Sequence, residues 1–198
     1  MKKLTLAILL GCVGASLGGD LDKGFAAYES GDYATALSEF RPLAEQGHVV
    51  AQLNLGLMYE GGLEGIAIGV PHDDKTAVKW YTLAAEQGHE LAQFRLGVSY
   101  SLGKGVLQHD KTALEWYTLA AEQGHVEAQY NLGLNYSRGK GVPQDYVYAH
   151  MWLNIAASQG DEGAAKQRER AARRMTAAEI SAARTLAREC VAKEYKGC

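Results

Sequence analysis

The chain has 198 residues and a formal net charge of −3. Apolar residues make up 47% and charged residues 22%, an ordinary globular balance that argues against an intrinsically disordered chain. The charge is uneven, because residues 20–164 carry 9 Lys/Arg against 19 Asp/Glu, whereas residues 165–198 carry 9 against 4. An acidic body does not suit a polyanion, so we expect no nucleic-acid partner.

The first 19 residues have the features of a cleaved signal peptide. Lys2 and Lys3 form a short positive segment, and the apolar run that follows is too short to span a bilayer. Small residues then precede Asp20, as a signal peptidase requires, so we place the cleavage between Ala15 and Asp20. No later segment is apolar enough to cross a membrane. We therefore predict a periplasmic or secreted protein.

A second interpretation of this segment is a lipid anchor. Leu9-Leu10-Gly11-Cys12 resembles a lipobox, in which Cys12 would be lipidated. That cleavage leaves an apolar region of about seven residues, the lower limit for such a segment. Leu10 before Gly11 is also a poor fit, and soluble export is the preferred hypothesis.

Internal repetition dominates the rest of the chain. The segments AQLNLGLMYEGG, AQFRLGVSYSLG and AQYNLGLNYSRG begin at Ala51, Ala92 and Ala128, and each is followed by a second matching segment that ends in AAEQGH or AASQGD. The second and third units are 36 residues apart, while the first is longer by five because GLEGIAIGV widens its loop. A fixed period of this size indicates stacked helical repeats.

Each unit is predicted to form two antiparallel helices, which we name helix A and helix B. In helix A the pattern A-x-x-x-L-G-x-x-Y places its apolar residues on one stripe. The glycine of this pattern costs about 1 kcal/mol inside a helix, so we expect a neighbouring helix to approach it closely. The three glycines are Gly56, Gly97 and Gly133.

Polar residues and glycines predict where these helices begin and end. Asp73 and Asp145 stand where a side chain can cap helix B in the first and third units. The second unit has His109 at that place, and its cap is expected to shift toward Asp110. Left-handed glycines are expected to stop the helices. They are Gly47, Gly88, Gly124 and Gly160.

The complete unit, ending in W-Y-x-x-A-A-E-Q-G-H, is similar to the Sel1-like repeat, a relative of the tetratricopeptide repeat. The resemblance implies an all-α fold, an α/α solenoid of stacked antiparallel helix pairs over residues 20–164. It also implies a protein–protein interaction module of the kind found in bacterial envelope and secreted proteins. The expected organisation is a degenerate unit at 24–48 and repeats at about 50–89, 91–125 and 127–161.

The basic segment 165–198 is predicted to cap the solenoid, whose last apolar face needs a cover. Thr176 and Glu179 form a capping-box pattern that opens a helix. The residues expected to form its buried stripe are Ile180, Ala183, Ala187, Cys190 and Val191.

Cys190 and Cys198 are the cysteines that remain after signal cleavage, and an oxidising compartment favours their pairing. Eight residues of continuous helix would separate them by about 12 Å, about twice the Cα distance that a disulfide permits. A bridge therefore requires the helix to end near Lys193 and the chain to fold back, for which Gly197 is suited. The alternative is a buried Cys190 and a free Cys198.

The histidines that follow the helix-ending glycines do not form a metal site. His48, His89 and His125 recur one per unit, so they lie in a row rather than converging on one point. We predict no metal and no cofactor.

The enzyme hypothesis rests on S-x-x-K matches at Ser101–Lys104 and Ser137–Lys140, the serine–lysine pair of penicillin-recognising enzymes. That motif needs its serine at the start of a helix, whereas these serines lie where helix A runs out, and no S-D-N or K-T-G follows. The alternative function is therefore a cell-wall or β-lactam-directed hydrolase of the kind some Sel1-like proteins are labelled as. We predict a non-enzymatic protein.

In the related tetratricopeptide fold, helix A lines the concave face, and this resemblance predicts a binding groove for a peptide or protein partner. The positions two before and two after the leucine of L-G-x-x-Y would face the groove, with a polar neighbour beside them. An equally weighted alternative is that several of these residues pack against the adjacent helix. The Gly62–Val70 insertion is another candidate surface. The predicted groove residues are Leu53, Asn54, Leu57, Phe94, Arg95, Val98, Tyr130, Asn131 and Leu134.

Overall fold

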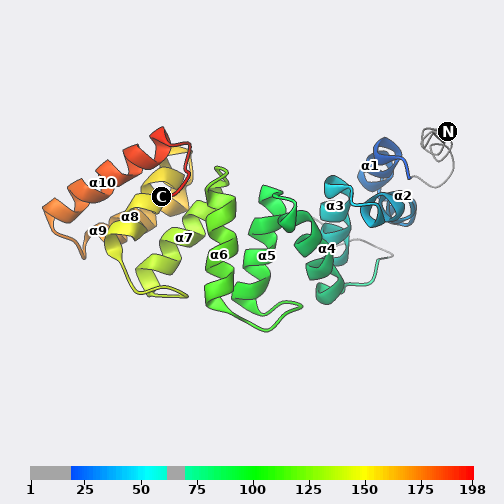
Figure 1. The fold of residues 1–198 in the computed structure, drawn as a ribbon, viewed down its shortest axis with the longest axis horizontal. Helices are drawn as coiled ribbons and strands as arrows, with labels where there is room; N and C mark the ends of the chain where they lie inside the picture. Colours follow the sequence, from blue (N-terminus) through cyan, green and yellow to red (C-terminus); the bar gives the residue numbers. More distant parts are fainter. Residues whose placement is uncertain (1–18, 62–69) are drawn as a thin grey trace, which may run out of the picture. The chain divides into compact units, whose positions relative to one another are not determined.

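A computed structural model describes residues 19–61 and 70–198. Every regular element within these ranges is an α-helix, which confirms the all-α prediction (Figure 1). Residues 1–18 of the predicted signal peptide and most of the Gly62–Val70 insertion lie outside the described residues. The chain divides into two compact units, residues 1–73 and residues 74–198, which are described separately.

The described residues of the first unit form three helices, each packed on the next along the chain. Gly24 of α1 approaches α2 so closely that a Cβ atom there would lie 2.5 Å from Phe40 Cε1. The degenerate segment 24–48 is therefore part of a complete helix pair that joins α3. The bounds are α1 Leu21–Glu29, α2 Tyr33–Glu45 and α3 Val49–Tyr59.

The second unit contains seven helices, and α4 to α9 each pack on the next along the chain (Figure 1). Helices α5 and α7 are helices A of the second and third repeats, and α6 and α8 are the corresponding helices B. The bounds are α4 Asp74–Glu86, α5 Glu90–Leu102, α6 Asp110–Ala121, α7 Val126–Arg138, α8 Tyr146–Ser158, α9 Glu162–Ala172 and α10 Ala177–Ala192.

Two glycines allow the close helix contacts in this unit. A Cβ atom at Gly97 would lie 2.7 Å from the ring of Tyr117, and one at Gly133 would lie 2.5 Å from Leu153 Cγ. Since real Cβ atoms are not found so close to a neighbour, the side chains of helix B occupy the space that each glycine leaves. The predicted close approach is confirmed at both positions.

The helix ends lie where the sequence predicted them, and one predicted cap is wrong. Gly88, Gly124 and Gly160 have φ angles of 89°, 92° and 100°, which confirms their left-handed conformation. Asp145 caps α8 as predicted, because its Oδ1 accepts hydrogen bonds from two backbone N–H groups. The predicted shift of the α6 cap is wrong, since His109 Nδ1 itself accepts from Thr112 N at 3.2 Å.

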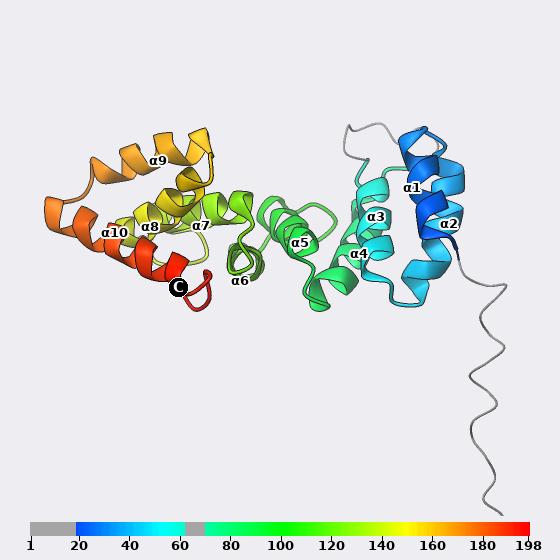
Figure 2. The same cartoon turned by 90° about the horizontal axis from the view of Figure 1, so that it is seen from above.

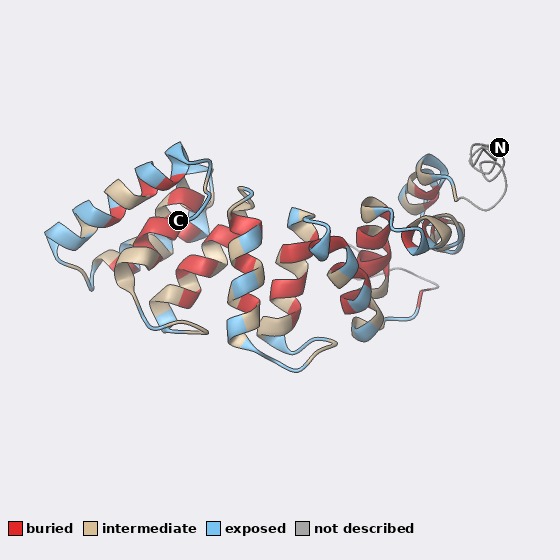
Figure 3. Ribbon diagram, in the orientation of Figure 1, coloured by how far each residue is buried: buried red, intermediate tan, exposed pale blue. Residues whose placement is uncertain are grey.

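The last helix, α10, covers α8. Thr176 and Glu179 form the predicted capping box at its start. Both α9 and α10 pack on α8 but make few contacts with each other (Figure 2). The buried residues of α10 are Ala183, Ala187 and Cys190, and the opposite side of this helix is exposed (Figure 3).

The stripe predicted for α10 is wrong at Val191, which is 46% exposed. Ala183, Ala187 and Cys190 follow one another at spacings of four and three, so they form a narrow contact line. Val191 is rotated by about 100° from Cys190 around the helix axis, which places it to one side of this contact line.

The chain folds back after α10. The helix ends at Ala192, Tyr195 N donates to the carbonyl oxygen of Cys190 at 2.9 Å, and Gly197 has a φ of 65°. The Cα atoms of Cys190 and Cys198 lie 5.5 Å apart, with their sulfur atoms in contact. This turn brings the two residues together as the predicted disulfide requires, and their oxidation in the cell stays a prediction.

Candidate partner-binding surface

Buried glutamines connect consecutive helices in both units. Gln52, Gln93 and Gln129 follow the first alanine of helix A and are at most 4% exposed. Each Nε2 donates to the carbonyl oxygen of an alanine near the end of the preceding helix, at 3.0, 3.2 and 3.2 Å. These glutamines were not among the predicted site residues, although they recur at the repeat spacing.

In the second unit these amides also bond to the next repeat. Gln123 Nε2 donates to Gln93 Oε1, and Gln159 Nε2 donates to Gln129 Oε1, both at 2.7 Å. Gln123 and Gln159 belong to the E-Q-G-H and S-Q-G-D segments that end helix B. The two glutamines of the repeat pattern therefore form a side-chain pair at each of these junctions.

The predicted groove residues belong to both units. Leu53 and Leu57 of α3 are 6% and 7% exposed. Asn54 is half-buried, and its Nδ2 donates to the carbonyl oxygen of Val50 one turn earlier. The first unit thus offers little apolar surface at these positions.

Phe94 lies on α5 and remains partly exposed. Its ring stacks on the imidazole of His125, with centroids 4.6 Å apart and an interplanar angle of 24°, and it also lies 6.0 Å from the ring of Tyr117. Because His125 caps α7, Phe94 contacts the start of the next helix A.

Tyr130 occupies the equivalent place on α7, and it too is partly exposed. It packs against the apolar cluster that contains Leu153 and Ala164. The positions expected to face a groove therefore contribute to packing between repeats while keeping part of their surface accessible.

The other predicted residues of the second unit are also half-buried. Val98 packs on the main apolar cluster of the second unit, which contains Tyr117 and Leu132. Asn131 Nδ2 donates to the carbonyl oxygen of Glu127 at 2.8 Å. We name the six half-buried residues the helix-A surface. They are Phe94, Arg95, Val98, Tyr130, Asn131 and Leu134.

Two of the three histidines that follow the helix-ending glycines cap the next helix with their side chains. His48 and His125 Nδ1 accept from backbone N–H groups at 3.4 and 3.3 Å, at the starts of α3 and α7. His89 occupies the same place before α5 but makes no such bond with its side chain. No group of three His, Cys, Asp or Glu residues able to hold a metal ion is present in the described parts of the chain.

The S-x-x-K segments lie at the wrong end of a helix for a serine nucleophile. Ser101 is in the last turn of α5, where Gly103 ends the helix in a left-handed conformation. Burial raises the pKa of Tyr117 to about 12, and a hydrogen bond with Ser101 acts in the opposite direction.

The second S-x-x-K segment has the same geometry. Ser137 Oγ donates to the carbonyl oxygen of Leu134, and Lys140 follows the left-handed Gly139. Lys140 Nζ lies 3.8 Å from Asp110 Oδ1. This lysine is therefore engaged in an ion pair with the start of α6, and the loop does not resemble a serine–lysine catalytic site.

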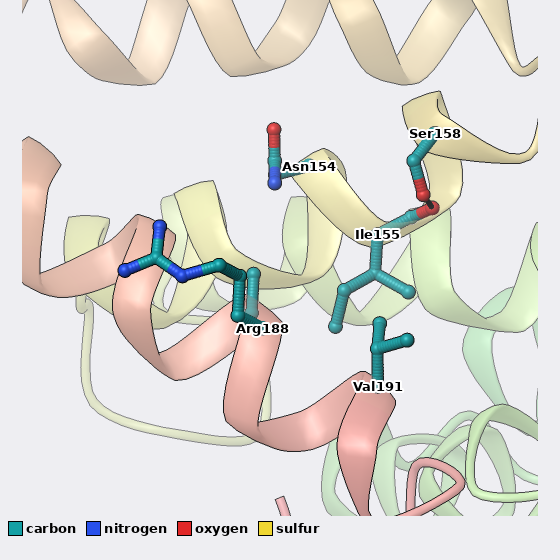
Figure 4. Close-up of a pocket in the computed structure, with 6 residues that line it drawn as sticks. Asn154, Ile155, Ser158, Arg188 and Val191 are labelled. Carbon is teal, nitrogen blue, oxygen red and sulfur yellow. Dashed lines mark hydrogen bonds between the residues drawn. The ribbon is translucent and has the colours of Figure 1, made fainter.

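The cap also forms two hollows on α8. One, of about 260 Å³, lies between α8 and α10, where Ile155 and Val191 face each other and the guanidinium of Arg188 extends away (Figure 4). The other is more polar, has a volume of about 210 Å³ and lies among α8, α9 and α10. No helix in the described ranges is long and apolar enough to cross a membrane.

The stacked helix pairs and their interlocking glutamines define an α/α repeat protein. A family model of the Sel1 repeat matches residues 49–89, 91–125 and 126–161. The chain therefore belongs to the Sel1 repeat family, as its sequence pattern predicted. Sel1 repeats are protein–protein interaction modules, and Sel1-repeat proteins are generally non-catalytic scaffolds.

Solved structures of the same kind are similar to this chain. A Sel1 repeat protein from Oxalobacter formigenes is 34% identical, with a TM-score of 0.68 over 75% of this chain and 59% of that one. The protein c5321, described as a protective antigen present in uropathogenic Escherichia coli strains and displaying an SLR fold, is 28% identical. Its TM-score is 0.55 over 88% of this chain and 45% of that one. This chain thus spans less than two thirds of either protein. No curated protein matches it.

Proposed function

We propose that the mature chain is a non-enzymatic scaffold of the bacterial envelope, periplasmic or secreted, that binds a peptide or protein on the helix-A surface. Membership of the Sel1 repeat family supports the interaction role. The positive, apolar and small-residue segments of residues 1–19 support export.

One observation carries the choice of surface. Helices α5 and α7 present the same three kinds of side chain at equivalent positions, an aromatic ring, a polar group and an aliphatic group, each partly exposed. An extended or helical peptide across both helices would meet two apolar contacts and a hydrogen-bonding group on each. The polar residues are Arg95 and Asn131.

The packing of Phe94 favours binding rather than opposing it. The stacking on His125 holds the ring in one position before a partner arrives. A side chain that is already fixed loses less conformational freedom on binding, so more of the contact energy contributes to affinity. Because Leu53 and Leu57 are buried, the proposal uses the second unit.

The test is affinity capture from an envelope extract with the mature wild type and two double variants. Asn131→Glu/Leu134→Glu places two negative charges on the helix-A surface. Leu83→Glu/Leu119→Glu places the same two charges on the exposed sides of α4 and α6, where the leucines are 36% and 44% exposed. Circular dichroism verifies that all three proteins are folded.

A protein retained by the wild type and the control variant but lost from the helix-A variant is the expected result. Equal capture by all three would place the binding site elsewhere. Loss from both variants would indicate a general charge effect rather than a defined surface.

A further inference from the structure

The polar hollow on α8 is enclosed by three helices of the second unit. His150 and Asn154 come from α8, Arg168 and Glu169 from α9, and Arg184 from α10. The space exists because α9 and α10 both pack on α8 yet diverge from each other (Figure 2). Its volume of about 210 Å³ is sufficient for a small polar group but not for a large cofactor.

Neither arginine of this hollow forms an ion pair with a carboxylate in the described part of the chain. Within the described residues, neither Arg168 nor Arg184 has an Asp or Glu oxygen within 4.0 Å. Arg168 donates one hydrogen bond, to Asn154 Oδ1 at 2.9 Å. A guanidinium group has five N–H donors, so most of the donors of Arg168 stay available for another acceptor.

Arg184 has even more N–H donors available than Arg168. It is exposed and makes no hydrogen bond with any residue that the structure describes. It lines the hollow from α10, and Arg168 lines it from α9. Glu169 supplies a single negative charge among the lining residues, which leaves the hollow with a positive excess.

His150 adds a buried polar atom without a partner. The residue is 3% exposed, and its Nδ1 has no hydrogen bond within the described part of the chain. Burial, together with the charges of Arg168 and Arg184, lowers the pKa of His150. Because this nitrogen is shielded from solvent, an anion held by Arg168 and Arg184 would act on His150 through its charge rather than through a hydrogen bond to Nδ1.

We propose that this hollow is an oxyanion site, in which Arg168 and Arg184 bind a phosphate or carboxylate group above His150. The guanidinium groups match the oxygens of either anion, and both can form charge-assisted hydrogen bonds with it. The anion is either free in solution or part of an acidic segment of another protein. The site is distinct from the helix-A surface, so it does not depend on the proposed function.

The test titrates the full mature chain separately with inorganic phosphate and with a hexaglutamate peptide. Binding is followed by calorimetry and by the imidazole resonances of His150. Arg184→Gln removes one of the two proposed guanidinium ligands. Arg188→Gln is the matched control, because Arg188 lies one turn later on α10, hydrogen-bonds to Thr185 and lines the other hollow.

Saturable binding of phosphate or of the peptide is expected for the wild type, with a shift of the His150 resonances. Arg184→Gln should weaken binding by about tenfold or more, and Arg188→Gln by about twofold at most. Equal losses in the two variants would show that the anion is attracted by a diffuse basic surface and would overturn the site.

The two probes also distinguish the source of the anion. If the peptide binds more tightly than phosphate and competes with it, the site recognises an acidic protein segment. If phosphate binds and the peptide does not, the ligand is a free anion. The absence of saturable binding for both would overturn the proposal, and it would leave the helix-A surface untouched.

Discussion

The buried amide of Gln129 is bonded on both sides. Its Nε2 donates to the carbonyl oxygen of Ala121, and its Oε1 accepts from Gln159 Nε2 at 2.7 Å. Replacing it with leucine would leave both partners without these bonds. Because the residue is fully buried, water cannot substitute freely.

We expect Gln129→Leu to lower the free energy of unfolding by about 1–3 kcal/mol. Gln144→Leu is the control, since Gln144 is exposed and bonds only locally. Urea unfolding measures both. A Gln129→Leu protein as stable as the control would show that the amide pair contributes nothing to the junction.

Gly133 tests the close contact between α7 and α8. Alanine favours a helix by about 1 kcal/mol over glycine. Here, however, its Cβ would collide with Leu153 and would lie 3.2 Å from the carbonyl oxygen of Ala149. We expect Gly133→Ala to destabilise the chain by about 1–3 kcal/mol in thermal or urea unfolding.

A double variant identifies the cause of that loss. Leu153→Ala alone is expected to cost about 2–5 kcal/mol, because it leaves a cavity. If the collision is responsible, the loss in Gly133→Ala/Leu153→Ala is smaller than the sum of the two single losses. Strict additivity would argue against the contact.

The lowered pKa of His150 makes the free energy of unfolding depend on pH. Its pKa is lowered from 6.5 in the folded chain, by burial first and then by Arg168 and Arg184. As the pH falls through about 6.5, the unfolded chain takes up a proton that the folded chain resists, so this stabilisation is lost on the acid side. Burial also lowers the pKa of His125, which acts in the same direction.

We therefore expect the free energy of unfolding to fall between pH 7 and pH 5.5, and to fall less in His150→Gln. Urea unfolding at several pH values measures both slopes. A variant with the wild-type slope would mean that His150 does not contribute to the pH dependence.

Single residues also show what the sequence could and could not predict. The glycine of L-G-x-x-Y was predictable, because a helix-breaking residue repeated inside a helix needs a packing reason. The role of Gln129 was not, because glutamine is usually exposed and its partners lie on other helices. His109 was misjudged because aspartate is the commoner cap.

At the scale of elements, the turn after α10 brings Cys190 and Cys198 together. Tyr195 and Cys198 both pack on the main apolar cluster, and Gly197 N donates to Glu122 Oε1 at 3.0 Å. The fold-back thus attaches the end of the chain to α6. The sequence predicted the turn because an uninterrupted helix would keep the cysteines too far apart.

We expect the oxidised protein to lose about 2 kcal/mol of stability on reduction, since the sequence separation of 8 closes only a short loop. A Cys198→Ser variant should be insensitive to the reductant. Urea unfolding with and without reductant compares the two proteins. If the stability of the wild type is also unchanged by the reductant, the thiols are free.

The cap shows a limit of pattern analysis at this scale. Its helix, its capping box and most of its stripe were predictable from local spacing. The divergence of α9 and α10 was not, because it results from how both helices pack on α8. The polar hollow between them is consequently absent from any local pattern.

At the scale of the whole molecule, the period of 36 residues predicted the helix pairs, and the resemblance of the repeat pattern to the Sel1-like repeat predicted the family. The groove prediction came from the related fold, and no finding tests it. The structure adds that Phe94 and Tyr130 each pack between repeats, which a one-dimensional pattern cannot distinguish from exposure to a partner.

The most direct measurement is the affinity of a captured partner, titrated by calorimetry against the wild type and the two charge variants. We predict that Asn131→Glu/Leu134→Glu weakens binding by about tenfold or more, which corresponds to about 1.4 kcal/mol or more, while Leu83→Glu/Leu119→Glu stays within about twofold of the wild type. Equal affinities for all three proteins would contradict binding at the helix-A surface.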